Sequence, residues 1–545
     1  MMKTNKLIAI LLSTLPMLSV VGCTDPTPST DEHGRTIINI FMNSGNTFEG
    51  VKKDSIVQKI EEEANVSLNI SGATHNSDYY TTLNPMINTG DIPDVIFSVP
   101  SSSRKAYDNW VEQELLWNID DLIAEKPGEY PYIEALLKSN QYKNIQFGDG
   151  LHTMIPLITS NSGWGIYYNA EWLINVGEVN EDGSAKTPET IEDVARVLQK
   201  FTENDPDQNG KDDTYGISPS GSTFYLNPLY HAFGVTTDYD LNAQGEATYM
   251  YMQPEFNDFL TWFNEMYNKG YVDPSFATNK NDIDRTKFFE GKVGMLITNA
   301  EQHISWIANT FENAHGKDKL VFGKAPVGTK NLGKEGAHGF SDWGGWWGGY
   351  SISTDCKDPH AALRLFNYLY SPEGTMLRIY GIEGQHYEKV DGEIVPLLEG
   401  RSQEYEYSFN TNTDENGNKI PTGYHTLGSL FSGNFKWSDD LSSLTHLVEP
   451  KFIDSKYADL VEDAYNKTTL KTSKLTNVTG FDPEMTTDMK KIEDELDTFA
   501  IKAIMDKNYS SSKFDEEIAK INSSQFDWPV IADMIEELAK KVGVN

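Results

Sequence analysis

The sequence predicts an α/β fold in which parallel strands alternate with helices. A β-rich run over Thr36–Met42 is followed by turn-forming residues, by a helical pattern from about 51 to 64, and by an alternating strand over Val66–Ile70. A strand, a helix and a strand at this spacing form a βαβ unit, which implies a parallel sheet. A helix near 78–88 then leads to a short apolar strand that ends at Phe97, as in a further βα repeat.

Helical patterns continue along the chain and dominate its C-terminal third. We expect helices over 119–124, 190–201, 255–269, 360–370, 489–505 and 530–542, and a strand over 293–298. Phe259, Trp262, Phe263 and Met266 follow one another at spacings of three and four, so we interpret them as a buried helical stripe.

The start of the chain predicts export and a lipid anchor. Lys3 and Lys6 precede an apolar run from Leu7 to Val21, which is shorter than the roughly 20 residues that span a bilayer. Small and branched apolar residues then precede Cys23, a pattern that resembles the bacterial lipobox, in which the cysteine is lipidated. We expect a signal peptide over 1–22 and a solvated tether over 23–35, attached to the outer face of the bacterial cytoplasmic membrane. The alternative is a signal peptide whose cysteine has no such role.

Composition narrows the class of partner. The chain has 545 residues and carries 45 basic against 81 acidic residues, a formal net charge of −36. This charge disfavours nucleic acid and other polyanions within a Debye length of about 8 Å, and we expect a neutral or cationic ligand. A solvated acidic surface that only aids solubility explains the charge equally well. Cys356 is the only cysteine besides Cys23, so we expect no internal disulfide.

Seven short motifs occur in the order in which they occur in a known family. They are Gly90–Asp94, Gly165–Leu173, Thr187–Asp193, Asp205–Lys211, Gly270–Pro274, Pro359–Tyr368 and Tyr380–Tyr387. From about residue 36 to the C-terminus the chain resembles the extracellular solute-binding proteins of family 1, the carbohydrate-binding lipoproteins that serve bacterial ABC importers. One departure is Asn169-Ala170, where many relatives have a basic and an acidic residue.

The resemblance implies a two-lobed, periplasmic-binding-protein-like II (Venus-flytrap) fold that closes on its ligand. It places lobe 1 at 36–155 and 340–382, and lobe 2 at 156–339 and 383–545. The crossings would lie near 154–164, near 336–344, and after the helix that ends near Tyr370. It also implies a monomer with an ABC-transporter permease as partner.

The segment from His338 to Tyr350 contains the strongest candidates for ligand contact. Trp343, Trp346 and Trp347 fall within five positions of a glycine-rich stretch and cannot all pack as one regular amphipathic element. Indole faces match the C–H faces of a pyranose, and the Asp342 carboxylate could accept hydrogen bonds from sugar hydroxyls. The alternative is that one or two of these tryptophans belong to the core at the lobe junction.

Other ligand candidates lie in loops near the expected sheet edges. Trp164, between two glycines at the first crossing, could be a stacking platform or a hinge-packing residue. Tyr225, Asn299 and Glu301 lie where the family's second lobe meets sugar. Asn43, Ser101 and Ser102 lie at first-lobe strand ends, where the loop beyond a strand holds ligands in open α/β sheets, although they could equally be turn formers. We expect Glu383 and His386 to be structural.

The loop from Asp205 to Asp213 resembles a calcium loop. Asp205, Asp207 and Asn209 supply oxygen at alternate positions, Gly210 is the sixth residue, and the Lys211 carbonyl would supply the seventh position, with Asp213 at the ninth. Gly216 stands where an EF-hand has its bidentate glutamate, and Thr214 stands where relatives often have an acid. We expect a structural Ca²⁺ here, with an Asp/Asn turn as the alternative.

The sequence contains none of the common catalytic motifs, such as a nucleophile elbow, a His-Glu-x-x-His zinc motif or a phosphate loop. Paired carboxylates of a glycosidase cannot be recognised from sequence, because only their folded separation identifies them. We therefore predict a non-enzymatic receptor that delivers an oligosaccharide to an importer. A secreted carbohydrate-active enzyme, or a glycan-binding sensor or adhesin, remains the alternative.

Overall fold

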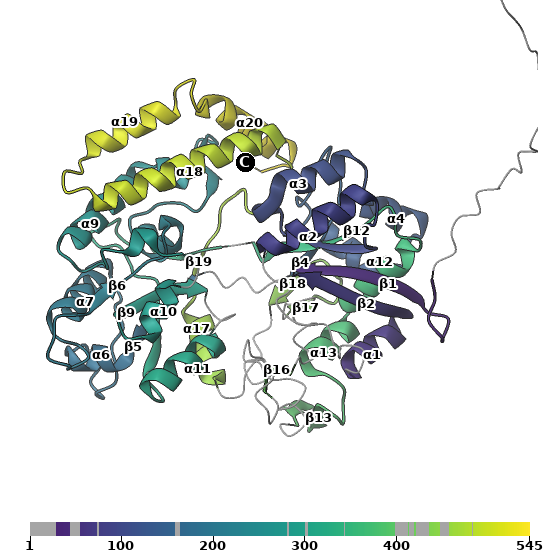
Figure 1. Cartoon of the computed structure of the whole chain (residues 1–545), viewed down its shortest axis with the longest axis horizontal. Helices are drawn as coiled ribbons and strands as arrows, with labels where there is room; N and C mark the ends of the chain where they lie inside the picture. Colours follow the sequence, from purple (N-terminus) through teal and green to yellow (C-terminus); the bar gives the residue numbers. More distant parts are fainter. Residues whose placement is uncertain are drawn as a thin grey trace, which may run out of the picture.

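The structure is a computed structural model that describes residues 29–43, 55–73, 76–158, 164–280, 283–299, 304–342, 344–397, 412–413, 419–420, 435–446, 457–481 and 483–544. Two α/β lobes lie side by side, and the three C-terminal helices lie across the top of the second lobe (Figure 1). Within the described residues, no helix has the length and apolarity needed to cross a bilayer.

The first lobe is built on a five-stranded sheet with the order β2-β1-β3-β12-β4. Its strands are β1 (Thr36–Asn43), β2 (Val66–Ala73), β3 (Val95–Ser98), β4 (Ile155–Ile158) and β12 (Trp346–Ile352). β1 pairs in parallel with both β2 and β3, which confirms the expected parallel βαβ unit. β12 runs antiparallel between β3 and β4, so a segment from far along the chain completes the sheet.

Helices cover both faces of this sheet. The first-lobe helices are α1 (Ser55–Glu63), α2 (Asn76–Thr89), α3 (Pro100–Glu112), α4 (Ile119–Glu125), α5 (Pro131–Lys138), α12 (Pro359–Leu369) and α13 (Pro372–Tyr380). On β12, the ring of Tyr350 packs against Phe366 of α12 with centroids 5.1 Å apart. The next residue, Ser351, lies 2.9 Å from the hydroxyl of Tyr107 on α3. Because successive strand side chains point to opposite faces, α12 and α3 cover opposite sides of the sheet.

The second lobe contains a four-stranded sheet with the order β10-β5-β9-β6. Its strands are β5 (Trp164–Asn169), β6 (Tyr215–Ile217), β9 (Val293–Asn299) and β10 (Leu320–Gly323). β6 is parallel to β9, whereas β5 is antiparallel to β9 and to β10. The surrounding helices are α6 (Ala170–Asn175), α7 (Ile191–Glu203), α8 (Asn227–His231), α9 (Pro254–Asn268), α10 (Ile283–Phe289), α11 (Ile304–His315) and α17 (Ala458–Lys467), with 3₁₀ turns η2 (Thr223–Leu226), η3 (Met250–Met252) and η4 (Phe276–Thr278).

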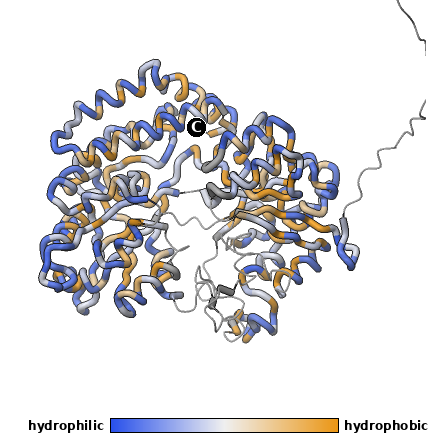
Figure 2. The backbone as a smooth tube through the Cα atoms, in the orientation of Figure 1, coloured by the Kyte–Doolittle hydropathy of each residue, from blue (hydrophilic) through white to orange (hydrophobic). Residues whose placement is uncertain are grey.

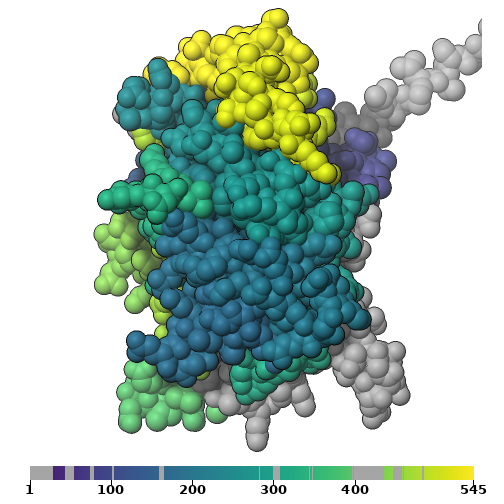
Figure 3. Space-filling model, turned by 90° about the vertical axis from the view of Figure 1, so that its left-hand side faces the viewer, coloured from purple at the N-terminus to yellow at the C-terminus, as the bar shows by residue number. Residues whose placement is uncertain are grey.

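The helix-rich C-terminal third is confirmed by α18 (Pro483–Met505), α19 (Ser511–Ile521) and α20 (Trp528–Lys541). These helices cap the second lobe, and they form the yellow upper part of its outer face in Figure 3. Short two-stranded ladders complete the fold: β7 (Tyr239–Leu241) with β8 (Ala247–Tyr249), β11 (Phe340–Ser341) with β19 (Leu470–Lys471), β13 (Tyr387–Val390) with β14 (Glu393–Pro396), β15 (Asn412–Thr413) with β16 (Lys419–Ile420), and β17 (Phe435–Trp437) with β18 (Leu444–His446).

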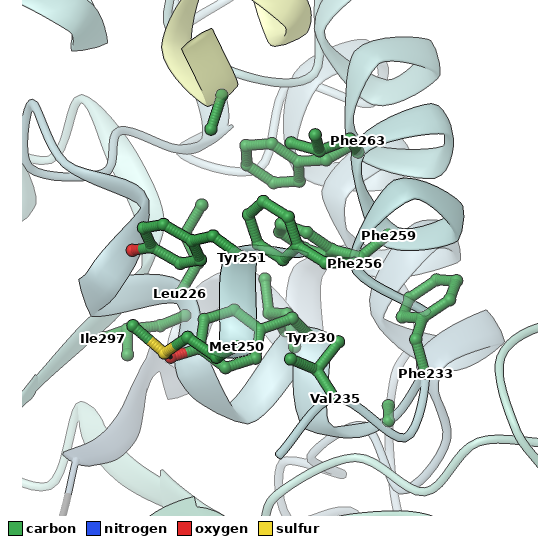
Figure 4. Packing of buried hydrophobic residues seen from close by; sticks show 14 of the residues in the cluster. Leu226, Tyr230, Phe233, Val235, Met250, Tyr251, Phe256, Phe259, Phe263 and Ile297 are labelled. Atoms are coloured by element: carbon green, nitrogen blue, oxygen red, sulfur yellow. Dashed lines mark hydrogen bonds between the residues drawn. The ribbon is translucent and has the colours of Figure 1, made fainter. Parts of the chain in front are cut away.

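Each lobe has its own hydrophobic core. Apolar residues concentrate in the strands and on the inner faces of the helices, whereas outward-facing turns are hydrophilic (Figure 2). The expected stripe on α9 is buried, with Phe259 and Phe263 fully inaccessible, and their rings stack 5.6 Å apart. Figure 4 shows both rings packed beside Tyr230, Tyr251 and other residues of the second core. Cys356 is buried, and burial raises the pKa of its thiol far above the ordinary value.

The described residues show three passages of the chain between the two lobes. The first passage lies between Ile158 of β4 and Trp164 of β5, within the expected range, and the return lies between β11 and β12, slightly later than expected. The third passage is later still. We expected residues 383–545 in the second lobe, but Phe435 and Trp437 belong to the first core, and the Trp437 indole N–H donates to the Tyr370 carbonyl at 2.7 Å. Among the described residues after Trp437, α17 is the first element that packs into the core of the second lobe.

Candidate functional site

The strand ends of the first sheet bring several predicted ligand residues to one edge. β1 and β3 are parallel, so Asn43 and Ser98 mark the same carboxyl edge. β12 is antiparallel to β3 and therefore begins at this edge with Trp346, which is paired with Ile158 at the end of β4. Ser101 follows at the start of α3. Four separate segments thus meet where open α/β sheets hold their ligands.

The second sheet presents an equivalent edge. β6 and β9 are parallel and end at Ile217 and Asn299, and antiparallel β5 begins opposite Asn299 with Trp164. Tyr225 lies on η2, just beyond β6, and lines a small pocket at these strand ends. The other lining residues are Ile217, Ser218, Pro219, Ser220, Leu226, Asp284, Leu296 and Ile297.

Short crossings connect these two edges directly. The chain leaves the first edge at Ile158 and enters the second at Trp164, and it returns from β11 to β12 between Ser341 and Trp346. Six residue steps span about 20 Å at most. The predicted ligand residues of both lobes therefore converge on the space beside the hinge.

Of the three tryptophans at the second crossing, Trp346 is the one whose side chain the structure describes. Trp346 is half-buried and packs against the first core, which agrees with our alternative that one tryptophan belongs to the lobe junction. Trp343 and Glu301 lie outside the described residues. The structure describes the backbone alone for six further candidates, Trp347, Trp164, Asn299, Asn43, Ser101 and Ser102. The indole sandwich remains a prediction.

Asp342 has a structural role that the sequence did not reveal. Its Oδ1 accepts a hydrogen bond from the Gly344 amide at 2.8 Å, and its Oδ2 accepts one from the Thr472 hydroxyl at 2.7 Å. Gly344 and Gly345 have φ of +73° and +72°, a conformation that favours glycine. The carboxylate that we expected to contact sugar therefore also holds the second crossing in its turn.

Residues 472–481, which we call the hinge strap, bind both lobes. On the second lobe, the Lys474 amide donates to Asp240 Oδ1 at 2.8 Å. On the first lobe, Asn477 Nδ2 donates to the carbonyls of Gln141 at 2.8 Å and of Gly344 at 2.7 Å. Further along the strap, Thr479 and Phe481 bond to the first lobe through Gln146 and Arg104, at 2.9 and 3.0 Å. Nothing in the composition of this stretch suggested the role, because it depends on partners more than 100 residues away.

A buried polar network supports the second-lobe pocket. Lys287 Nζ lies 2.5 Å from Asp273 Oδ2 and donates to Asn279 Oδ1 at 2.7 Å. Asn279 Nδ2 in turn donates to the Pro219 carbonyl at 2.7 Å, and the Ser218 hydroxyl donates to Asp273 at 2.6 Å. Burial alone would raise the pKa of Asp273, but hydrogen bonds from Lys287, from the Ser218 hydroxyl, and from the amide and hydroxyl of Ser275 outweigh it and keep the pKa below its ordinary value. Asp273 of the Gly270–Pro274 motif therefore holds one wall of the pocket.

The predicted calcium loop is tightly wound around its own side chains. Asp205 Oδ1 and Oδ2 accept hydrogen bonds from the amides of Asn209 and Gly210, each at 3.0 Å. Asn209 Nδ2 lies 2.7 Å from Asp207 Oδ2 and 3.1 Å from Asp213 Oδ1, so these side chains already face one another. Desolvation and the neighbouring carboxylates of Asp205 and Asp213 raise the pKa of Asp207.

A bound hard cation offsets the mutual repulsion of crowded carboxylates, which is the repulsion that raises their pKa. Within the described residues, however, no group of three or more His, Cys, Asp or Glu side chains is arranged to hold a metal ion. Asp205, Asp207, Asn209, Asp213 and the Lys211 carbonyl therefore remain a predicted ligand set.

The glutamate and histidine of the Tyr380–Tyr387 motif have local partners. His386 is fully buried and its Nδ1 accepts a hydrogen bond from the Ile382 amide at 2.9 Å, and Glu383 pairs with Lys389 at 3.0 Å. Both contacts agree with the structural role expected for these residues.

Comparison with known proteins identifies the family. A model of the bacterial extracellular solute-binding proteins matches residues 47–376. The chain belongs to this family. Polygalacturonan/rhamnogalacturonan-binding protein YtcQ of Bacillus subtilis is 23% identical over 363 residues, which span 65% of this chain and 68% of YtcQ. Lipoprotein LipO of the same species is 24% identical over 333 residues, 59% of this chain and 62% of LipO.

Solved structures confirm the two-lobed fold of the solute-binding family. A Streptococcus pneumoniae structure titled ABC-transporter substrate binding protein FusA EF-hand mutant in complex with fructo-nystose superposes with a TM-score of 0.61. The two chains are 15% identical, and the alignment covers 93% of this chain and 99% of FusA. The family match confirms the resemblance inferred from the seven motifs, and the similarity to solved structures confirms the expected fold class.

Proposed function

We propose that this protein captures an oligosaccharide between its two lobes and delivers it to the permease of an ABC importer. The observation that carries this proposal is the convergence of both sheets' ligand-binding edges on the hinge. Membership of the extracellular solute-binding family supports it, as do the sugar-binding names of YtcQ and FusA. A ligand that contacts both edges favours the closed form, because it binds that form more tightly.

Binding without turnover is the property that separates this function from its alternative. The purified protein is incubated with a panel of oligosaccharides and followed by thermal unfolding and by chromatography of the sugars. A ligand at a hundredfold its Kd adds about 2.7 kcal/mol to stability. Stabilisation with the sugar recovered intact supports the receptor, whereas new products identify a carbohydrate-active enzyme. Stabilisation by none of the sugars contradicts the proposal.

The tryptophans of the second crossing provide the residue-level test. Trp343→Ala and Trp347→Ala should each weaken binding, because each removes a candidate stacking face. Trp262→Ala is the control for general destabilisation, because Trp262 is buried within the second core. Unchanged sugar affinity in both crossing variants would remove the indoles from the site.

We also propose a lipid anchor at Cys23 and a structural calcium ion at the 205–213 loop. The export pattern before Cys23 and the name of LipO support the anchor, and the donor set of the loop supports the ion. Metabolic labelling with palmitate that disappears in Cys23→Ala would confirm the anchor. Elemental analysis of the purified protein tests the ion directly.

A further inference from the structure

The N-terminus of α3 lies at the ligand edge of the first lobe. β3 runs toward this edge and ends at Ser98, and α3 begins two residues later at Pro100. The helix then runs back along the sheet, because Tyr107 reaches Ser351, which is paired with Ile96 in the middle of β3. The first turn of a helix of 13 residues is therefore directed from the first edge into the space beside the hinge.

Within the described residues, no acidic or capping side chain is bonded to this helix end. The N-cap residue is Val99, which has no side-chain acceptor, and its own N–H and C=O are bonded to the Tyr80 hydroxyl at 3.1 and 3.2 Å. The first turn is Pro-Ser-Ser-Ser, without Asp or Glu. An α-helix leaves its first amides without partners inside the helix and carries partial positive charge there.

A second, independent observation points to a ligand at the same place. Ser98 is 1% exposed, and its hydroxyl has no hydrogen-bond partner in the part of the chain that the structure describes. Ser98 lies on the same face of β3 as Ile96, the face that α3 covers, so its side chain is on the helix side of the sheet, at the strand end where α3 begins. Buried hydroxyls nearly always have a hydrogen-bond partner, so the Ser98 hydroxyl is a candidate to bond to a ligand.

We propose that an acidic group of the bound glycan, the carboxylate of a uronic acid unit, occupies this position. It would accept hydrogen bonds from the amides of Ser101 and Ser102 and from the Ser98 hydroxyl. The site offers donors and the positive end of a helix, which suit a carboxylate better than a sugar hydroxyl. This inference rests on the proposed function and replaces the neutral ligand expected from net charge.

The global charge of −36 does not oppose this assignment. Surface charges are screened beyond about 8 Å at physiological salt, whereas the helix amides act in direct contact. Arg104, in the next turn of α3, is not the anion-binding group, because its Nε already lies 2.8 Å from both Asp108 oxygens. The helix end itself supplies the positive potential.

Matched acidic and neutral glycans test the inference. The full mature protein is titrated by calorimetry with trigalacturonate and its methyl ester, and with trimannuronate and mannotriose. The acidic member of at least one pair should bind about tenfold more tightly, the gain expected from a carboxylate at a partly buried helix terminus. Equal or weaker binding of the acid in both pairs overturns the inference, while binding of a neutral member keeps the receptor function. Failure of every glycan, including the wider panel above, rejects the function itself and this inference with it.

Two substitutions then locate the carboxylate. Ser98→Ala should reduce the ratio of acidic to neutral affinity without lowering the melting temperature of the free protein, because the lost hydroxyl has no hydrogen-bond partner among the described residues. Ser102→Glu places a carboxylate on the helix end and should bring the ratio close to one, whereas Ser102→Gln, of the same size, should reduce it less. If the acidic glycan still binds about tenfold more tightly than its neutral counterpart in both Ser98→Ala and Ser102→Glu, its carboxylate binds elsewhere.

Discussion

The hinge strap predicts a large effect from one asparagine. Asn477 donates to two main-chain carbonyls, at 2.8 and 2.7 Å, and its own φ is +65°. Each lost hydrogen bond costs about 1 kcal/mol net, and an alanine in the left-handed region costs roughly 1 kcal/mol more. Asn477→Ala should therefore lower the free energy of unfolding by about 3 kcal/mol. Asn477→Gly, which tolerates the positive φ, should lower it by about 2 kcal/mol.

Urea unfolding followed by tryptophan fluorescence measures this difference, with an unchanged slope as the check that one transition is compared. Asn65→Ala is the matched control, because Asn65 also has a positive φ, of +50°, but lies exposed. It should cost only the backbone term of roughly 1 kcal/mol. If Asn477→Ala costs no more than Asn65→Ala, the strap does not hold the lobes together and the reasoning fails.

Three further predictions concern other parts of the molecule. Burial lowers the pKa of His231 to about 3, so the unfolded chain binds more protons between about pH 6.5 and 3 and stability falls as pH falls. At pH 5 the free energy of unfolding should be lower by about 2 kcal/mol for this reason. In His231→Asn, unfolding measured as a function of pH should not show this loss between neutral pH and pH 5. Lys287→Met leaves Asp273 without its cation and should weaken both sugar binding and stability by about 2 kcal/mol. The control Lys269→Met breaks an exposed ion pair and should cost under about 1 kcal/mol. Equal losses in the two variants would show that the Asp273 network does not support the site. Calcium should raise the melting temperature of the protein, and Asp207→Asn should abolish that rise. In the presence of a chelator, Asp207→Asn should be as stable as the unchanged protein or more stable. If calcium still raises the melting temperature of Asp207→Asn, the 205–213 loop is not the calcium site.

Local patterns predicted the fold well where neighbours in sequence determine it. β1, α1 and β2 follow from alternating and helical apolar spacing, and the buried stripe on α9 follows from its period. The sequence did not predict that β12 would lie as an antiparallel strand between β3 and β4 in the first sheet. Its glycine-rich segment gains its strand conformation from pairing with β3 and β4, which lie about 190 residues or more earlier in the chain.

The candidate site shows the same division. Asn43 could be placed at a strand end because the βα alternation itself determines that edge, whereas Tyr225 and Asn299 were placed by the family resemblance. The roles of Asp342, Asp273 and Asn477 depend on hydrogen bonds that only the folded chain forms, so sequence alone could not assign them. The late third passage has the same cause, since Trp437 joins the first core through a contact with Tyr370.

The alternation of the chain between lobes has a consequence for biogenesis. Neither half can complete its interior from one continuous stretch, because β12 fills the first sheet and α18–α20 cover the second. During synthesis the first lobe therefore keeps an apolar surface uncovered until residues beyond 346 are available to fold, and the second lobe does so until the last helix is made. A slow step before the chain becomes resistant to proteases should accompany its folding.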